Sequence, residues 1–158
     1  MAINFEDKQT KAILNKIAAF CAAKERSAYE VSTKLSGLGV EEHEEFIEWL
    51  IHENFLNEER FAIAYAADKF RFNQWGKIKI KMMLKQHDLA NDLIQNALNK
   101  IDINAYLDAL KKMLKQKQAT IKDKPILNQK LAMMRFALSR GFEAEQIRLI
   151  INDIFKKK

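Results

Sequence analysis

The sequence predicts an all-α protein built from tandem three-helix repeats. Residues that favour helices (Ala, Leu, Met, Lys, Arg, Gln and Glu) fill more than half of the 158 positions, whereas Val and Thr together supply only five. Four glycines and one proline are too few for the many turns of a β-sandwich or barrel. In addition, a similar short turn occurs three times along the chain, which indicates an internal repeat.

The first predicted unit, residues 1–56, has helices expected over residues 8–23, 27–36 and 41–53. Ser27 and Glu30 match a capping box, in which the serine hydroxyl accepts from a backbone N–H and the carboxylate reaches back. The second helix is expected to end at Gly37 or Gly39, because glycine readily adopts the left-handed C-cap. Cys21 falls on the apolar stripe of the first helix, which predicts core packing.

The second predicted unit, residues 57–101, has helices expected over residues 58–72, 75–87 and 90–100. Asn57 is the expected N-cap of the first of them. The segment 77–81 alternates Lys and Ile as a strand would, but residues 82–84 continue the apolar pattern without a turn, so we expect a helix. Ile78 and Met82 form a second apolar strip on this helix, which we expect to bridge two packed units.

The third predicted unit, residues 102–158, has helices expected over residues 102–118, 125–140 and 143–155. Asp102 and Asn104 are alternative starts for the first helix. Pro125 suits the first position of the second helix, because its fixed φ is helical and its missing N–H is not needed there. Gly141 is the expected stop of that helix.

The repeated turns, residues 35–40, 84–89 and 137–142, define the three units. Each has a helix end, a residue that tolerates a left-handed backbone (Gly39, Asp88, Gly141) and then one large apolar residue. A unit of about 50 residues buries too little apolar surface on its own, so we expect neighbouring units to stabilise one another by stacking.

Residues for catalysis, cofactors or metals are not grouped in the sequence. The three histidines lie at unrelated spacings, and neither common glycine-rich nucleotide loop is present. We therefore expect no enzymatic activity, no cofactor and no metal site. The glutamates at positions 41, 42, 44 and 45 are expected to form a solvated first helical turn, complementing the helix dipole.

The sequence also indicates a cytoplasmic protein. Its longest apolar run, residues 62–67, has six residues, far fewer than the ~18 that a membrane span requires. The first residues do not show the basic segment and apolar stretch of a secretory signal. One cysteine cannot form an internal disulfide, which fits a reducing cytosol.

Charge is distributed unevenly along the chain. The overall charge is +6, with −4 over residues 1–56, +2 over residues 57–104 and +8 over residues 105–158. Lys77, Lys81 and Lys85 form one stripe on the fifth predicted helix, and the seventh adds a second set of lysines. Such stripes suit phosphate backbones, although a lysine-rich solvated face is an open alternative.

The order and spacing of several motifs resemble the RecX family of recombination regulators. The motifs are Arg26-Ser-x-x-Glu30-Val-x-x-Lys-Leu35 and Leu56-Asn-Glu-Glu-Arg-Phe-Ala62, followed by Tyr65, Arg71, Gly76, Ile80 and Leu84. The likeness spans roughly residues 10–155 and is most specific over residues 56–89. Two departures are Glu58, where the family usually has Asp, and Asp88-Leu89, where it usually has Gly-Ile.

The resemblance implies a curved, elongated array that binds as a monomer in the groove of the RecA filament on DNA. Family members restrain RecA's ATPase, strand-exchange and co-protease activities, with effects on DNA repair and the SOS response, and some bind single- or double-stranded DNA. A stand-alone DNA-binding protein and a helical scaffold are the alternatives. The residues expected to contact DNA or the filament are Arg60, Lys69, Arg71, Lys77, Lys81, Lys85, Lys111, Lys112 and Lys115.

Overall fold

A computed structural model describes residues 3–156, and all regular secondary structure in that range is α-helical. The ends of the first and third predicted units, residues 1–2 and 157–158, lie outside the described range. The helices are α1 (Lys8–Ala23), α2 (Ala28–Gly37), α3 (Glu44–His52), α4 (Glu58–Asn73), α5 (Lys77–Gln86), α6 (Asn91–Asn99), α7 (Ile103–Ala119), α8 (Ile126–Ser139) and α9 (Ala144–Ile154). The predicted fold class is confirmed.

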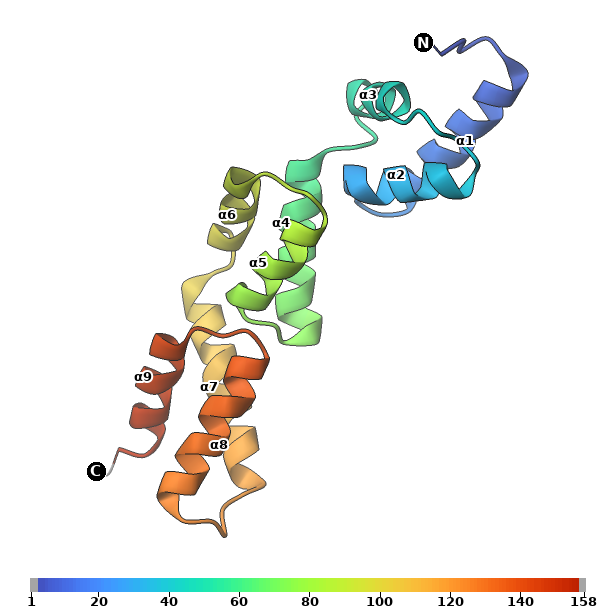
Figure 1. Ribbon diagram of the computed structural model, residues 1–158. Helices are drawn as coiled ribbons and strands as arrows, with labels where there is room; N and C mark the ends of the chain where they lie inside the picture. Colours follow the sequence, from blue (N-terminus) through green and yellow to red (C-terminus); the bar gives the residue numbers. More distant parts are fainter. Residues whose placement is uncertain (1–2, 157–158) are drawn as a thin grey trace.

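The helices form three successive triplets along an elongated molecule (Figure 1). Helices α1 to α3, α4 to α6 and α7 to α9 pack mainly within their own triplets. We call these triplets the first, second and third units. The left-handed residues of the predicted turns are present in each, with φ of 80° at Gly39, 60° at Asp88 and 89° at Gly141.

Local capping explains where several helices begin. The Ser27–Glu30 capping box is formed at the start of α2, and the Asn57 side chain accepts from the Arg60 N–H at the start of α4. The Asp102 side chain accepts from the Ala105 N–H, which settles the start of α7 in favour of Asp102 as N-cap.

The predicted starts of α3 and α5 are wrong by three and two residues, and Pro125 is the N-cap of α8 rather than its first residue. α3 begins at Glu44 rather than residue 41, because the chain leaves the left-handed Gly39 in a connection held by a 2.8 Å hydrogen bond between His43 Nε2 and the Val40 carbonyl. α5 begins at Lys77 rather than residue 75, because Gln74 is left-handed and Gly76 is extended. α8 begins one residue after Pro125, whose ψ of 149° is not helical.

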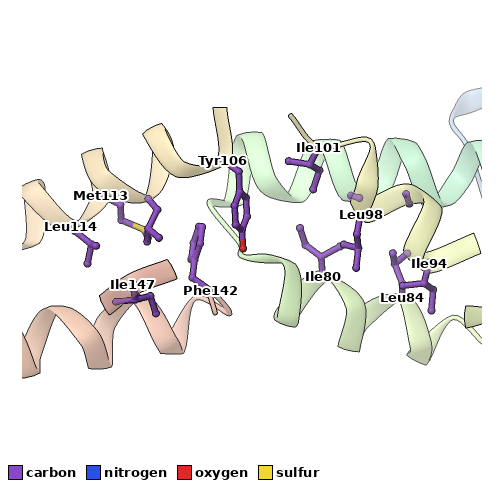
Figure 2. Packing of buried hydrophobic residues seen from close by; sticks show 14 of the residues in the cluster. Ile80, Leu84, Ile94, Leu98, Ile101, Tyr106, Met113, Leu114, Phe142 and Ile147 are labelled. Atoms are coloured by element: carbon purple, nitrogen blue, oxygen red, sulfur yellow. The ribbon is translucent and has the colours of Figure 1, made fainter. Parts of the chain in front are cut away.

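Within residues 3–156 the buried side chains form two hydrophobic clusters, although there are three units. One cluster lies entirely within the first unit and includes Cys21, as predicted. The other runs without interruption through the second and third units. Figure 2 shows its buried side chains in a row, with Tyr106 and Phe142 between the residues of the two units. The second and third units therefore share one core.

The outer face of α5 differs from its prediction. The inner positions Ile80 and Leu84 are fully buried, whereas the side chains of Ile78 and Met82 are 52% and 54% exposed. Helix α5 packs against α4 and α6, which cover only its inner side. The second apolar strip therefore does not bridge two units, and it faces solvent.

Candidate nucleic-acid interface

The second and third units are joined by direct backbone contacts. At the start of α5, the Gly76 N–H donates to the Arg140 carbonyl at 2.7 Å, and the Ile78 N–H donates to the Gly141 carbonyl at 2.9 Å. The N–H of Lys77 donates to the Tyr106 hydroxyl, also at 2.9 Å. The third unit therefore satisfies the N–H groups from Gly76 to Ile78 at the start of α5, which have no partner within the helix.

The first and second units meet at the equivalent place through side chains. Ser27 Oγ, at the N-cap of α2, shares a 2.9 Å hydrogen bond with Nδ1 of His87, the C-cap of α5. The Ala28 N–H donates to the Glu58 carboxylate at 3.0 Å. Both junctions join the C-cap of one helix to the N-cap of another. At the first junction the acceptors and donors include the side chains of Ser27, His87 and Glu58, whereas at the second they are mainly backbone groups.

These junctions place α8, α5 and α2 head to tail. The C-cap of α8, Arg140, contacts the N-cap of α5, and the C-cap of α5 contacts the N-cap of α2. We call this arrangement the helix column. Its helices follow one another along the array in Figure 1.

A hollow with basic and apolar walls opens beside the second junction. Its volume is about 270 Å³, and it brings together Arg71 from α4 and Lys112 from α7, which are 41 positions apart in the sequence. Gln74 and Gln116 add amide groups that can donate hydrogen bonds. The remaining lining residues are Phe70, Ala105, Ala109, Met113 and Phe142, so no acidic side chain lines it. Two cations and two amides around an apolar floor suit a phosphate group with a sugar or base beside it.

A cluster of aromatic and basic side chains lies on the second unit. Lys69 Nζ lies 5.1 Å from the Trp75 ring centroid, and Lys79 Nζ lies 4.6 Å from it. Lys69 also lies 5.4 Å from the Tyr65 ring. These contacts hold the ammonium groups beside ring faces. Phe61 is buried and Tyr65 packs at the edge of the core.

The second unit matches the sequence pattern of a known domain. Residues 57–98, which span α4 to α6, fit the domain described as "RecX, second three-helix domain". "Regulatory protein RecX" of Clostridium perfringens strain SM101 is 36% identical over 122 residues, covering 72% of this chain and 54% of the relative. "Regulatory protein RecX" of Prosthecochloris aestuarii is 27% identical over 154 residues, covering 94% and 97%. The chain belongs to the RecX family.

Structural similarity extends across the RecX fold. The crystal structure of RecX from Lactobacillus salivarius superposes with a TM-score of 0.83 at 19% identity, covering 91% of this chain and 95% of that one. Some RecX relatives are longer: the chain spans 32% of the protein from Lactobacillus johnsonii and 55% of that from Clostridium perfringens strain 13. The tandem helical repeat is therefore the RecX fold.

Two of the basic residues singled out on RecX resemblance have partners within the chain. Arg60 Nε lies 3.0 Å from a Glu25 carboxylate oxygen, and its other nitrogens donate to the side chain and the carbonyl of Asn54. Lys111 Nζ lies 2.7 Å from the Asp153 carboxylate. Arg60 therefore ties the second unit to the first, and Lys111 ties α7 to α9.

The other basic residues occupy three places. Arg71 and Lys112 line the hollow, and exposed Lys115 lies one turn further along α7. Lys69 belongs to the aromatic cluster, and half-buried Lys77 lies 5.0 Å from the Tyr106 ring. The remaining two, Lys81 and Lys85, are exposed on the outer face of α5.

Sequence reasoning did not identify Gln74, Gln116 or Lys79. A search for charge stripes overlooks glutamines, and Lys79 lies off the stripe of lysines spaced by four. The pairing of Arg71 with Lys112 depends on the packing of α4 beside α7 and has no local signal in this sequence.

Two buried side chains, Tyr106 and Cys21, have raised pKa values. Burial raises the pKa of the Tyr106 phenol, and its hydrogen bond to Glu143 raises it further. Burial likewise raises the pKa of the Cys21 thiol, so this cysteine is held in its unreactive form. Over the described residues, no three acidic, histidine or cysteine side chains are grouped to hold a metal, and no helix has the length and apolarity to cross a membrane.

Proposed function

We propose that this protein regulates homologous recombination by binding the RecA–DNA filament and restraining its ATPase, strand-exchange and co-protease activities. Membership of the RecX family carries the proposal, since a relative matches over 94% of this chain. The action is by binding rather than catalysis, and the protein acts as a monomer in the cytoplasm.

The hollow supports a contact with the DNA backbone. Arg71 and Lys112 supply two positive charges to one opening without acidic neighbours in its lining. Exposed Lys115 lies one turn from Lys112 and extends the basic surface along α7. Contacts of this kind neutralise phosphates without reading bases, so we expect sequence-independent binding of single- and double-stranded DNA that weakens steeply with salt.

The test is a titration of the single-stranded-DNA-dependent ATPase of the cognate RecA. We expect inhibition below one molecule per recombinase, which would indicate action at filament ends or gaps. Arg71→Gln with Lys112→Gln should raise the half-inhibiting concentration about tenfold, equivalent to ~1.4 kcal/mol. The matched control changes two exposed lysines of the first unit, Lys8→Gln with Lys16→Gln, and should behave as wild type.

A second function, DNA binding without RecA, is favoured by the absence of acidic residues from the lining of the hollow. It predicts tight binding to DNA alone and the same apparent affinity with or without the recombinase. Wild-type protein that binds DNA but leaves the ATPase rate unchanged at every ratio would replace the proposed function with this one.

A further inference from the structure

The helix column exposes a row of aliphatic side chains that the fold does not use. On α5, Ile78 is 52% exposed and Met82 is 54% exposed. On α8, Leu127, Leu131 and Leu138 are 66%, 52% and 45% exposed. Spacings of four and seven residues place each set on one face of its helix. We call these five residues the outer ridge.

Ile78 and Leu131 of the outer ridge occupy equivalent positions of two repeats. Ile78 lies ten residues before Asp88, and Leu131 lies ten residues before Gly141, the corresponding turn residue. The C-terminus of α8 is joined to the N-terminus of α5 by the Gly76 and Ile78 backbone hydrogen bonds. Both helices are drawn in front of the first helix of their unit in Figure 1. The ridge is therefore carried by two helices that the shared core holds in a fixed relation.

The charged residues of the two helices that carry the outer ridge all have one sign. Helices α5 and α8 contain no aspartate and no glutamate. Lys81 and Lys85 are exposed one turn from the apolar residues of α5, and Arg135 is exposed one turn from Leu131. The surface is thus apolar with basic flanks.

Nucleic acid does not suit this surface. Phosphates would meet the flanking lysines, but the aliphatic side chains would gain little from a sugar–phosphate backbone, and the ridge has no ring on which a base could stack. Burying aliphatic groups that are about half exposed is favourable against another apolar surface. Contiguous exposed apolar groups with a polar rim are typical of protein interaction sites.

We propose that the outer ridge is a protein-docking surface for a partner whose matching surface is apolar with an acidic rim. The proposal rests on the proposed function, under which that partner is a subunit of the recombinase filament. The ridge and the hollow are then two separate contacts, one for protein and one for phosphate. Neither contact replaces the other.

The experiment separates the two contacts with polar substitutions that retain helix propensity. The ridge variant combines Ile78→Gln, Met82→Gln, Leu131→Gln and Leu138→Gln. The control variant combines Ile51→Gln and Leu149→Gln. These two aliphatic residues of α3 and α9 are exposed to a similar extent as the ridge residues (54% and 61%). Circular dichroism and the melting temperature report whether each variant keeps its fold.

Two readouts are compared: anisotropy of labelled single-stranded DNA with the regulator alone, and inhibition of the RecA ATPase. We expect the ridge variant to bind DNA within twofold of wild type while its half-inhibiting concentration rises about tenfold or more. The control should match wild type in both. If the ridge variant folds poorly, Ile78→Gln with Leu131→Gln tests the same surface with two substitutions and the same expected results.

Any of the following results would overturn the proposal. A ridge variant that inhibits the ATPase like wild type, or that loses DNA affinity in parallel, shows that the ridge is not a separate protein contact. A further test is whether the wild-type protein self-associates or binds anionic vesicles. If the ridge variant alone loses that property, the ridge binds a second copy of the chain or a membrane surface instead. Wild-type protein without effect on the ATPase overturns the proposed function as well, which distinguishes the two failures.

Discussion

At the scale of single residues, two glycines allow the close approach of the second and third units. A Cβ on Gly76 would overlap the Gly141 carbonyl and the Phe142 nitrogen. A Cβ on Gly141 would lie 2.6 Å from the Lys79 nitrogen, and the φ of 89° is unfavourable for any other residue. Both positions therefore require glycine for steric reasons, and Gly141 also for its backbone conformation.

Gly141→Ala is expected to lower the free energy of unfolding by about 2–4 kcal/mol, because the new Cβ meets backbone atoms and the left-handed conformation is strained. Urea unfolding measures the change. Gly37→Ala is the control, since Gly37 ends α2 with no atom within 4 Å of its added Cβ, and it should be neutral or stabilising. Equal losses in the two variants would contradict this account of the junction.

Tyr106→Phe is expected to lower stability by about 1–2 kcal/mol at pH 7–9, because the Lys77 N–H and the Glu143 carboxylate lose a buried partner. The folded state raises the pKa of Tyr106, so the folded protein holds this proton more tightly than the unfolded chain does. The stabilisation is therefore complete below the ordinary pKa of 10 and declines as pH rises beyond it.

Unfolding of both proteins between pH 7 and 11 measures this difference. The gap between wild type and Tyr106→Phe should narrow above pH 10. Tyr29→Phe, on a 54% exposed side chain, is the control and should remain close to wild type throughout. A constant difference in the free energy of unfolding up to pH 11 would show that ionisation of the Tyr106 hydroxyl does not affect stability.

At the scale of helices, we expect the first junction to be less stiff than the second. The second is made by backbone groups and a shared core, whereas the first relies on Ser27 with His87, Ala28 with Glu58, and Arg60 with Glu25. The Glu25 and Arg60 side chains are each about one-third exposed, so salt weakens their attraction. The first unit is therefore the part of the array that can change its angle.

Arg60→Ala with Glu58→Gln should broaden the distribution of distances between the first and second units, because it removes the Arg60–Glu25 ion pair and the charge of Glu58 at the first junction. Spin labels on cysteines introduced at the exposed positions Lys16 and Gln95 measure that distribution. Labels at Gln95 and Gln116 span the second junction and should give an unchanged distribution. Broadening of both pairs alike would show that the two junctions are equally stiff.

Sequence reasoning predicted most helices because their signals are local. Ser27 with Glu30, Asn57 and Gly141 act on residues within a turn of themselves. It was wrong about Ile78 and Met82, because which face of α5 is covered depends on where α4 and α6 lie.

Charge patterns predicted candidate lysines and arginines but not their partners. Glu25 lies 35 positions from Arg60, and Asp153 lies 42 positions from Lys111, so neither pairing has a signal in a helical period. The hollow could not be predicted for the same reason, because Arg71 and Lys112 come together only through the packing of the second and third units. Local sequence patterns therefore predicted which residues were candidates. The packing of the units determines which of these candidates are paired within the chain and which lie together on the surface.

At the scale of the molecule, two cores imply two cooperative parts. Leu50 belongs to the core of the first unit and Leu110 to the core shared by the other two, and both are fully buried. The second and third units are expected to unfold together, whereas the first unit unfolds separately because its contacts with the rest are mainly polar.

Leu50→Ala should destabilise the first unit by about 2–4 kcal/mol and leave the rest protected, and Leu110→Ala should do the reverse. Hydrogen exchange followed by mass spectrometry reports each segment separately. Faster exchange throughout the chain in both variants would show that the array unfolds as one cooperative whole.

The helix column also gives the molecule an electric dipole along its length. Its inner poles are neutralised where the carbonyls of α8 meet the amides of α5, so the unneutralised poles are positive at the start of α8 and negative at the end of α2. Side chains polarise the molecule the same way, with a net charge of −4 over residues 1–56 and +8 over residues 105–158. A polyanion at a distance therefore exerts a torque that turns the third unit toward it before contact.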